Sequence, residues 1–199
     1  MQSITRRVLA TFAIAASSAA AVAGPVAAQS VPTPAQHFGF EIGSDRNLAD
    51  WVALTAYFER LAETSDRVAV DTLGMTTDDR PFVMLTITSP ENHARLDELH
   101  DIQMKLADPR LVQDDAELES LFDAGRAVVL ITQGIHATEV GASQMSANLA
   151  YELASSDSER VRQILDEVIL LQIPSLNPDG LQWVTEWYTS LVGTEYEGA

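Results

Sequence analysis

The sequence contains no cysteine, so the fold has to depend on its core, and on a metal if one binds, rather than on disulfides. Basic residues are scarce as well. Twelve Lys and Arg face 29 Asp and Glu, a formal net charge of -17, which argues against nucleic acid and anionic membrane surfaces as partners. Hydrophobic residues make up 46% of the 199 positions and charged residues 21%, which is typical of one globular domain and excludes a disordered or fibrous chain.

Residues 1–28 have the pattern of a secretory signal peptide. Arg6 and Arg7 form a short positive region, residues 8–23 are apolar and uncharged, and residues 26–28 are small enough for cleavage before Gln29. A transmembrane anchor is the alternative, but the apolar run has about sixteen residues and a bilayer span needs roughly twenty. We therefore expect export to the periplasm or the extracellular space, with no stable membrane span after cleavage.

The remainder divides into a flexible lead-in over residues 29–46, which carries Pro32 and Pro34, and one domain over residues 47–199. Apolar periodicity in this domain predicts an α/β fold. We expect a helix over 47–64 capped by Asn47 or Ser44, antiparallel strands over 67–73 and 80–88, and helices over 91–106 and 114–122. A strand over 126–132, helices over 140–153 and 159–165, a strand over 168–173 and a helix over 181–191 should follow. The helix over 140–153 has Ala142, Met145, Leu149 and Leu153 on one face and small residues elsewhere, so it can pack closely against a sheet. Helices separate the last two strands in the sequence, so these strands should be joined by a right-handed crossover and run parallel.

A His-x-x-Glu pair, His136 and Glu139, follows the β-branched, apolar run over 128–132, which is typical of a fully buried strand. Ligands of open α/β sheets bind outside the carboxyl ends of the strands. An imidazole and a carboxylate three residues apart can converge on one cation, and these two ligand types suit zinc. The alternative is that both residues merely cap the next helix. Residues 177–180, Asn-Pro-Asp-Gly, predict a tight turn after the second parallel strand, at the same edge of the sheet.

Together these motifs resemble the zinc carboxypeptidase family, the pancreatic carboxypeptidase-like metallopeptidases. The resemblance is carried by residues 134–139, Gly-Ile-His-Ala-Thr-Glu, and by the Asn-Pro-Asp-Gly motif about forty residues later. The stretch from Leu73 to Pro81 is similar to the family's turn between its first two strands, with Thr76 and Asp79 in place of the usual serine and glycine. This resemblance implies the N-terminal part of an α/β/α sandwich with a mixed central sheet.

The resemblance also implies a Zn2+ ion held by His136 and Glu139, with an activated water that attacks a peptide carbonyl of a peptide or protein substrate. The family's third ligand is a downstream histidine, but no histidine follows His136 here. No Lys or Arg follows Arg162, so the family's oxyanion and carboxylate-binding arginines have no counterpart, and no catalytic residue is assigned. We therefore expect a C-terminally truncated catalytic domain over 47–199, inactive and poorly stable alone, with apolar sheet surface uncovered.

Two other functions stay open at this point. The related branch of zinc-dependent deacylases, which cleaves N-acyl amino acids, uses a similar His-x-x-Glu pair. A non-catalytic exported fragment that binds a partner would be consistent with the missing third ligand, although it would not need both His136 and Glu139. The sequence does not indicate the oligomeric state.

Residues 5–9, Thr-Arg-Arg-Val-Leu, also resemble a twin-arginine export signal, which suits a protein that folds around its metal before export. Changing Arg6 and Arg7 together to lysine should then block export, because that pathway requires the arginine pair and not positive charge alone. The check is the fraction of protein outside the cytoplasm. Unchanged export of the double variant would contradict the twin-arginine hypothesis.

Overall fold

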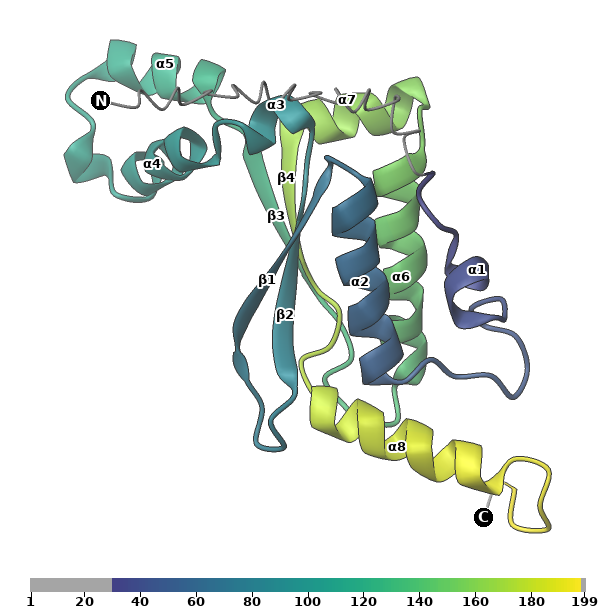
Figure 1. Cartoon of the computed structure of the whole chain (residues 1–199). Coiled ribbons are helices and arrows are strands. Elements are labelled where there is room, and N and C mark those ends of the chain that lie inside the picture. The colour runs from purple at the N-terminus through teal and green to yellow at the C-terminus, as the bar shows by residue number, and fades with distance from the viewer. Residues whose placement is uncertain (1–29, 198–199) are drawn as a thin grey trace, which may run out of the picture.

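The computed structural model describes residues 30–197, so the predicted signal peptide over 1–28 lies outside the described residues. It contains a mixed four-stranded sheet with the strand order β1-β2-β4-β3 (Figure 1). The strands are β1 (Val68–Met75), β2 (Pro81–Ile87), β3 (Ala127–Thr132) and β4 (Val168–Ile173). The helices are α1 (Pro34–Phe38), α2 (Trp51–Thr64), α3 (Pro90–His93), α4 (Leu96–Ala107), the 3-10 turn η1 (Pro109–Leu111), α5 (Asp115–Ala124), α6 (Val140–Ser155), α7 (Glu159–Glu167) and α8 (Pro178–Leu191). The predicted α/β class is confirmed.

Strand pairing places the two sequence motifs at one edge of the sheet. β2 pairs antiparallel with both β1 and β4, whereas β3 and β4 run parallel, as predicted. Their last paired residues are Thr132 and Ile173. The segments that follow the two strands therefore leave the sheet side by side, and one carries His136 while the other carries Asn177.

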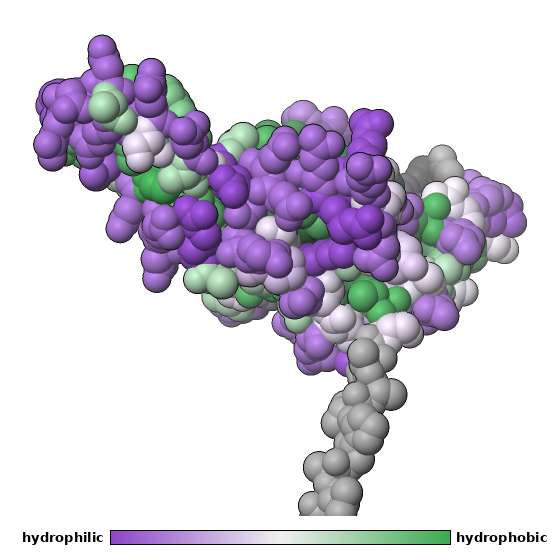
Figure 2. All heavy atoms as spheres, turned by 90° about the horizontal axis from the view of Figure 1, so that it is seen from above, coloured by the Kyte–Doolittle hydropathy of each residue, from purple (hydrophilic) through white to green (hydrophobic). Residues whose placement is uncertain are grey.

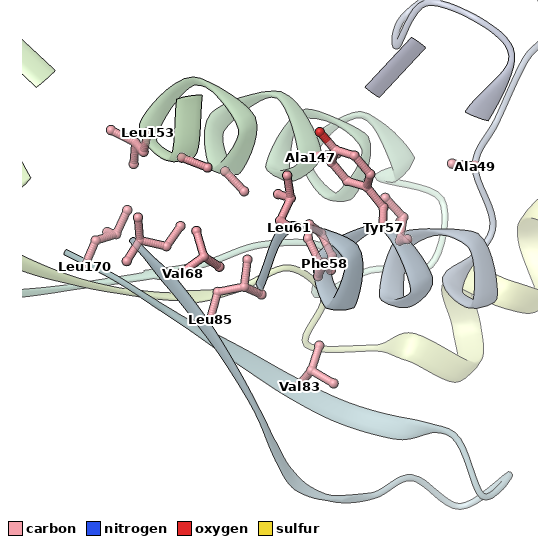
Figure 3. Packing of buried hydrophobic residues seen from close by; sticks show 14 of the residues in the cluster. Ala49, Tyr57, Phe58, Leu61, Val68, Val83, Leu85, Ala147, Leu153 and Leu170 are labelled. Carbon is pink, nitrogen blue, oxygen red and sulfur yellow. The ribbon is translucent and has the colours of Figure 1, made fainter. Parts of the chain in front are cut away.

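The main core lies between one face of the sheet and helices α2 and α6, which run side by side in Figure 1. In Figure 3, Phe58 and Leu61 of α2 belong to one packed cluster with Val68 and Leu85 of the sheet and Ala147 of α6. The three- and four-residue spacing of apolar residues in α2 is confirmed, although Val52 is 63% exposed. Five apolar residues of the helix are buried: Trp51, Leu54, Tyr57, Phe58 and Leu61.

The opposite face of the sheet has a smaller core. Neighbouring residues of a strand point to opposite faces, so Leu170 of β4 joins the main core while Ile169 packs with Leu99, Ile102 and Leu121 of α4 and α5. Among residues 30–197, the second helical layer of the expected sandwich thus covers one end of this face. Figure 2 shows that end of the molecule, seen from above, with a mainly hydrophilic surface.

The prediction that β3 is fully buried is wrong. β3 pairs only with β4 among the described strands, so it forms an edge of the sheet, and most of its residues are exposed. Val128, Val129 and Leu130 are among the exposed large hydrophobic residues. An apolar β-branched run indicates a strand, but it does not indicate which neighbours the strand has. The expectation that apolar sheet surface is uncovered agrees with this edge.

Helix α6 buries only part of the predicted apolar face: Leu153 is in the core and Leu149 packs against it, but Ala142 is exposed. Met145 is exposed, whereas Ser143, Ser146, Ala147 and Ala150 are buried. Small side chains let the backbone of α6 approach α2 and the sheet closely, and this outweighs the preference for burying a long apolar residue.

Two predicted helix boundaries also need correction. Helix α2 begins at Trp51, and its N-cap is Asp50, whose carboxylate accepts a hydrogen bond from the Ala53 amide at 2.8 Å, rather than Asn47 or Ser44. The single helix predicted over 91–106 is two helices, α3 and α4. The side-chain amide of the buried Asn92 fixes α3 to the end of α7, because it donates hydrogen bonds to the Leu165 and Asp166 carbonyls.

The described part of the predicted flexible lead-in packs against the domain. Helix α1 has a complete capping box around Thr33, and the Phe38 ring lies 5.2 Å from the ring of Tyr57. The Tyr57 hydroxyl donates a hydrogen bond to the Pro32 carbonyl at 2.9 Å, and burial raises the pKa of this phenol. Aromatic packing and this hydrogen bond therefore order a stretch whose prolines suggested flexibility. Across residues 30–197, no helix combines the length and apolar character needed to cross a membrane.

A pair of leucine substitutions tests the position of β3. Leu85 of β2 is 0% exposed and Leu130 of β3 is 58% exposed. Leu85→Ala should lower the free energy of unfolding by about 3 kcal/mol, because it leaves a cavity in the core. Leu130→Ala should lower it by less than about 1 kcal/mol. Denaturant unfolding of both variants is the measurement, and equal losses would mean that β3 is covered in solution.

Candidate metal centre

The loop between β3 and α6, residues 133–139, carries both candidate ligands. It closes with a turn in which the Glu139 amide donates a hydrogen bond to the His136 carbonyl at 3.0 Å. Glu139 occupies the N-cap position of α6, but its side chain makes no capping hydrogen bond. Its carboxylate turns to His136 instead. The alternative in which Glu139 merely caps the helix is therefore wrong.

His136 and Glu139 form a close pair. Glu139 Oε1 lies 2.8 Å from His136 Nδ1, and Glu139 Oε2 accepts a weaker hydrogen bond from the His136 amide at 3.4 Å. A carboxylate only accepts, so Nδ1 carries the proton in this contact. The hydrogen bond from the ring holds the pKa of Glu139 below its usual value, against the opposing effect of partial desolvation. The two side chains are 71% and 54% exposed, so a solute can reach both of them.

By residue type, this pair matches two positions of a zinc site. One imidazole nitrogen and one carboxylate oxygen face each other, and both atom types are common zinc ligands. A catalytic zinc normally has three protein ligands. Within the part of the chain that the structure describes, no group of three or more His, Asp or Glu side chains is placed to hold a metal ion. The loop therefore brings together the two residues that the sequence predicts as ligands.

Two buried glutamines, Gln133 and Gln172, form hydrogen bonds at the base of this loop, where it leaves β3. The backbone amide of Gln133 donates to the Ile173 carbonyl at 3.0 Å, and its backbone carbonyl accepts from the Leu176 amide at 2.8 Å. These two bonds join the segments that follow β3 and β4. Gln172, fully buried in β4, donates from its side-chain amide to Gln133 Oε1 at 3.0 Å. Sequence analysis gave neither glutamine a role. Gln172, a polar residue in the otherwise apolar strand β4, was the available signal.

Gly134 begins the exposed part of the loop and requires glycine for two reasons. Its φ is +58°, in the left-handed region. A Cβ atom at this position would also collide with the Ser143 hydroxyl oxygen of α6. The Gly134 carbonyl accepts a hydrogen bond from the Ser175 hydroxyl at 3.4 Å, which ties the loop to the segment after β4.

The Asn-Pro-Asp-Gly motif starts helix α8, so the prediction of a tight turn is wrong. Asn177 is the N-cap, and its Oδ1 accepts a hydrogen bond from the Gly180 amide at 3.0 Å, while Pro178 takes the first helical position. Gly180 is needed for close approach rather than for positive φ. A Cβ on Gly180 would lie 2.8 Å from the Ala137 Cβ, beside His136, and 2.6 Å from Asn177 Nδ2.

Asp179 links this helix start to the turn between β1 and β2. Its Oδ1 accepts from the Thr76 hydroxyl at 2.6 Å and from Arg80 Nη1 at 2.8 Å, and its Oδ2 accepts from the Asp78 amide at 3.3 Å. Burial alone would raise the pKa of Asp179, but these hydrogen bonds outweigh it and hold the pKa below its usual value. Sequence analysis saw both motifs but did not connect them.

Comparison with known proteins gives three findings. Residues 54–195 match the family described as zinc carboxypeptidase. No curated protein matches the sequence. Among solved structures, the chain is similar to thrombin activatable fibrinolysis inhibitor (TM-score 0.49, 13% identity, 75% of this chain and 31% of that one) and to a metallo-carboxypeptidase from Burkholderia cenocepacia (TM-score 0.44, 22% identity, 63% of this chain and 26% of that one). The chain thus spans less than a third of either structure.

Two glycine substitutions test the contact between α8 and the loop. Gly180→Ala should lower the free energy of unfolding by about 1 to 3 kcal/mol, because the new methyl group overlaps Ala137 and Asn177. Gly141, in the first turn of α6, has nothing within 4 Å of an added Cβ, so Gly141→Ala should be neutral or stabilising by up to about 1 kcal/mol. Denaturant unfolding compares the two. Equal effects would contradict the close contact.

Proposed function

The chain belongs to the zinc carboxypeptidase family, and from this we propose that it contributes His136 and Glu139 as two of the zinc ligands of a secreted metallocarboxypeptidase. The observation that carries the proposal is the convergence of His136 Nδ1 and Glu139 Oε1, 2.8 Å apart at the carboxyl edge of β3 and β4. This edge is where α/β sheets bind ligands. The residue types, their order and their position all agree with a hydrolytic zinc site.

The role of each residue follows from its chemistry. Zinc, when bound, supplies a Lewis acid that polarises a carbonyl and lowers the pKa of a bound water toward about 7. His136 would bind through a ring nitrogen that has lost its proton, and Glu139 through its ionised carboxylate. A glutamate carboxylate is ionised at neutral pH, as ligation requires, and the hydrogen bond from His136 lowers the pKa of Glu139 further in the metal-free chain.

The proposed reaction is hydrolysis of a peptide bond in a peptide or protein. We propose that the 199-residue chain does not complete this reaction alone, since the loop provides two ligands and a catalytic zinc normally has three. The predicted signal peptide over 1–28 supports an exported location, periplasmic or extracellular. The net charge of -17 supports a partner other than nucleic acid.

Zinc titration of the purified chain tests the metal site, with two histidines as a matched pair. His136 and His100 are both 71% exposed, and each lies beside an acidic residue. The wild-type chain and His100→Ala should bind zinc with equal affinity. His136→Ala should bind at least about tenfold more weakly, since loss of an outer-shell partner alone costs 10–100-fold.

Competition with a chromophoric chelator gives the affinities, and circular dichroism checks that each variant is folded. Glu139→Gln keeps the size of the side chain and removes its charge, so its affinity should fall in the same way as that of His136→Ala. Equal zinc uptake by wild type and His136→Ala would remove the metal site and, with it, the proposed function.

A further inference from the structure

We infer that Asp179 is a positioning residue for the candidate metal loop, and this inference rests on the function proposed above. Asp179 fixes the first turn of α8 to the β1–β2 turn, and that first turn presses against the residue next to His136. Its role is to fix the position of His136 in the metal-free chain.

The first step is the anchoring of Asp179. Its carboxylate accepts three hydrogen bonds, from Thr76, Arg80 and the Asp78 amide, all of them in the turn between β1 and β2. The side chain is only 16% exposed, so these contacts are shielded from water more than a surface ion pair would be. Thr76 Oγ1 also accepts from the Arg80 amide at 3.0 Å, which fixes the turn itself.

The second step is the contact between α8 and the loop. Gly180 follows Asp179 directly and lies so close to Ala137 that a Cβ would come within 2.8 Å of the Ala137 Cβ. Ala137 in turn follows His136 directly. A small rotation or slide of the α8 start therefore displaces the backbone that carries the imidazole, because closely packed groups transmit displacement instead of absorbing it.

The third step compares the contacts of Asp179 with the other hydrogen bonds at the start of α8. Asn177 caps the helix through the Gly180 amide, and this bond sets the helix start but not its place relative to the sheet. Gln182, in the second turn, accepts from the Trp51 amide at 2.9 Å and so joins α8 to α2, but not to the β1–β2 turn. The Ser175 hydroxyl reaches the Gly134 carbonyl at 3.4 Å, a long hydrogen bond. Of the contacts at the α8 start described here, those of Asp179 are the charge-assisted ones, and such hydrogen bonds are roughly twice as strong as neutral ones.

The test is Asp179→Asn in the 199-residue chain, with Glu117→Gln as its control. Glu117 of α5 is similarly enclosed, at 22% exposed, and accepts from Lys105 Nζ at 2.8 Å and from the Gln113 amide at 2.7 Å, but it belongs to the α4–α5 pair. Asp179→Asn should weaken zinc binding about tenfold and shift the His136 ring signals in the NMR spectrum of the metal-free chain. Glu117→Gln should do neither.

A second pair separates positioning from simple loss of stability. Thr76→Val removes the hydroxyl donor to Asp179 and should weaken zinc binding in the same direction, whereas Thr76→Ser keeps the donor and should restore wild-type affinity. Affinities are measured well below the unfolding midpoint of each variant. A merely structural role would lower the midpoint and leave both the affinity and the His136 signals unchanged.

The outcomes distinguish this inference from the proposed function. If wild type binds zinc through His136 and neither Asp179→Asn nor Thr76→Val changes the affinity or the His136 signals, the positioning role is wrong and the metal site stands. If His136→Ala binds zinc as wild type does, the metal site is wrong, and unshifted His136 signals in metal-free Asp179→Asn would overturn the positioning role as well. If Asp179→Asn fails to fold, the Thr76 pair decides.

Discussion

The pair of backbone hydrogen bonds made by Gln133 is the constraint on which the candidate site depends. Its backbone amide bonds to the Ile173 carbonyl and its backbone carbonyl to the Leu176 amide, so the two segments stay joined one residue beyond β3 and three residues beyond β4. The candidate ligands His136 and Glu139 and the Asn-Pro-Asp-Gly motif all come after Gln133 in the chain. The loop with His136 and Glu139 leaves on one side, and the segment that starts α8 leaves on the other. Had the two segments separated at the strand ends, the motifs would share an edge without touching.

Buried amide side chains extend the same principle through the fold. Gln172 bonds to Gln133 below the loop, Gln144 bonds through its Oε1 to the Ala49 amide at 2.9 Å, and Gln182 accepts from the Trp51 amide at 2.9 Å. Leaving a buried amide unpaired costs about 1 to 3 kcal/mol, so each of these contacts favours one arrangement over its alternatives. Gln144 and Gln182 hold the start of α2 against α6 and α8. In a chain without cysteine, such polar contacts set the relative positions of elements that apolar packing alone leaves less defined.

The sequence was sufficient for features that depend on local pattern. The 3.6-residue period of α2, the antiparallel β1–β2 pair and the parallel β3–β4 pair were all predicted, and with them the edge that carries His136 and Glu139. Features that depend on distant partners were not predicted. β3 has the composition of a buried strand but lies at an edge, and Met145 of α6 is exposed while small residues beside it are buried. The helix that starts at Pro178 did have a local signal, the Asn177 cap followed by proline, which the turn interpretation overlooked. Asp179 and Thr76 are 103 positions apart, and no local signal joins them.

The central claim is that one imidazole and one carboxylate of this chain bind the same zinc ion. X-ray absorption spectroscopy of the zinc-loaded chain measures this directly, because an imidazole ligand gives a characteristic multiple-scattering pattern beyond the first shell of nitrogen and oxygen atoms. The account predicts that the imidazole pattern of wild type is preserved in His100→Ala and lost in His136→Ala. An imidazole pattern that persists unchanged in His136→Ala would contradict it.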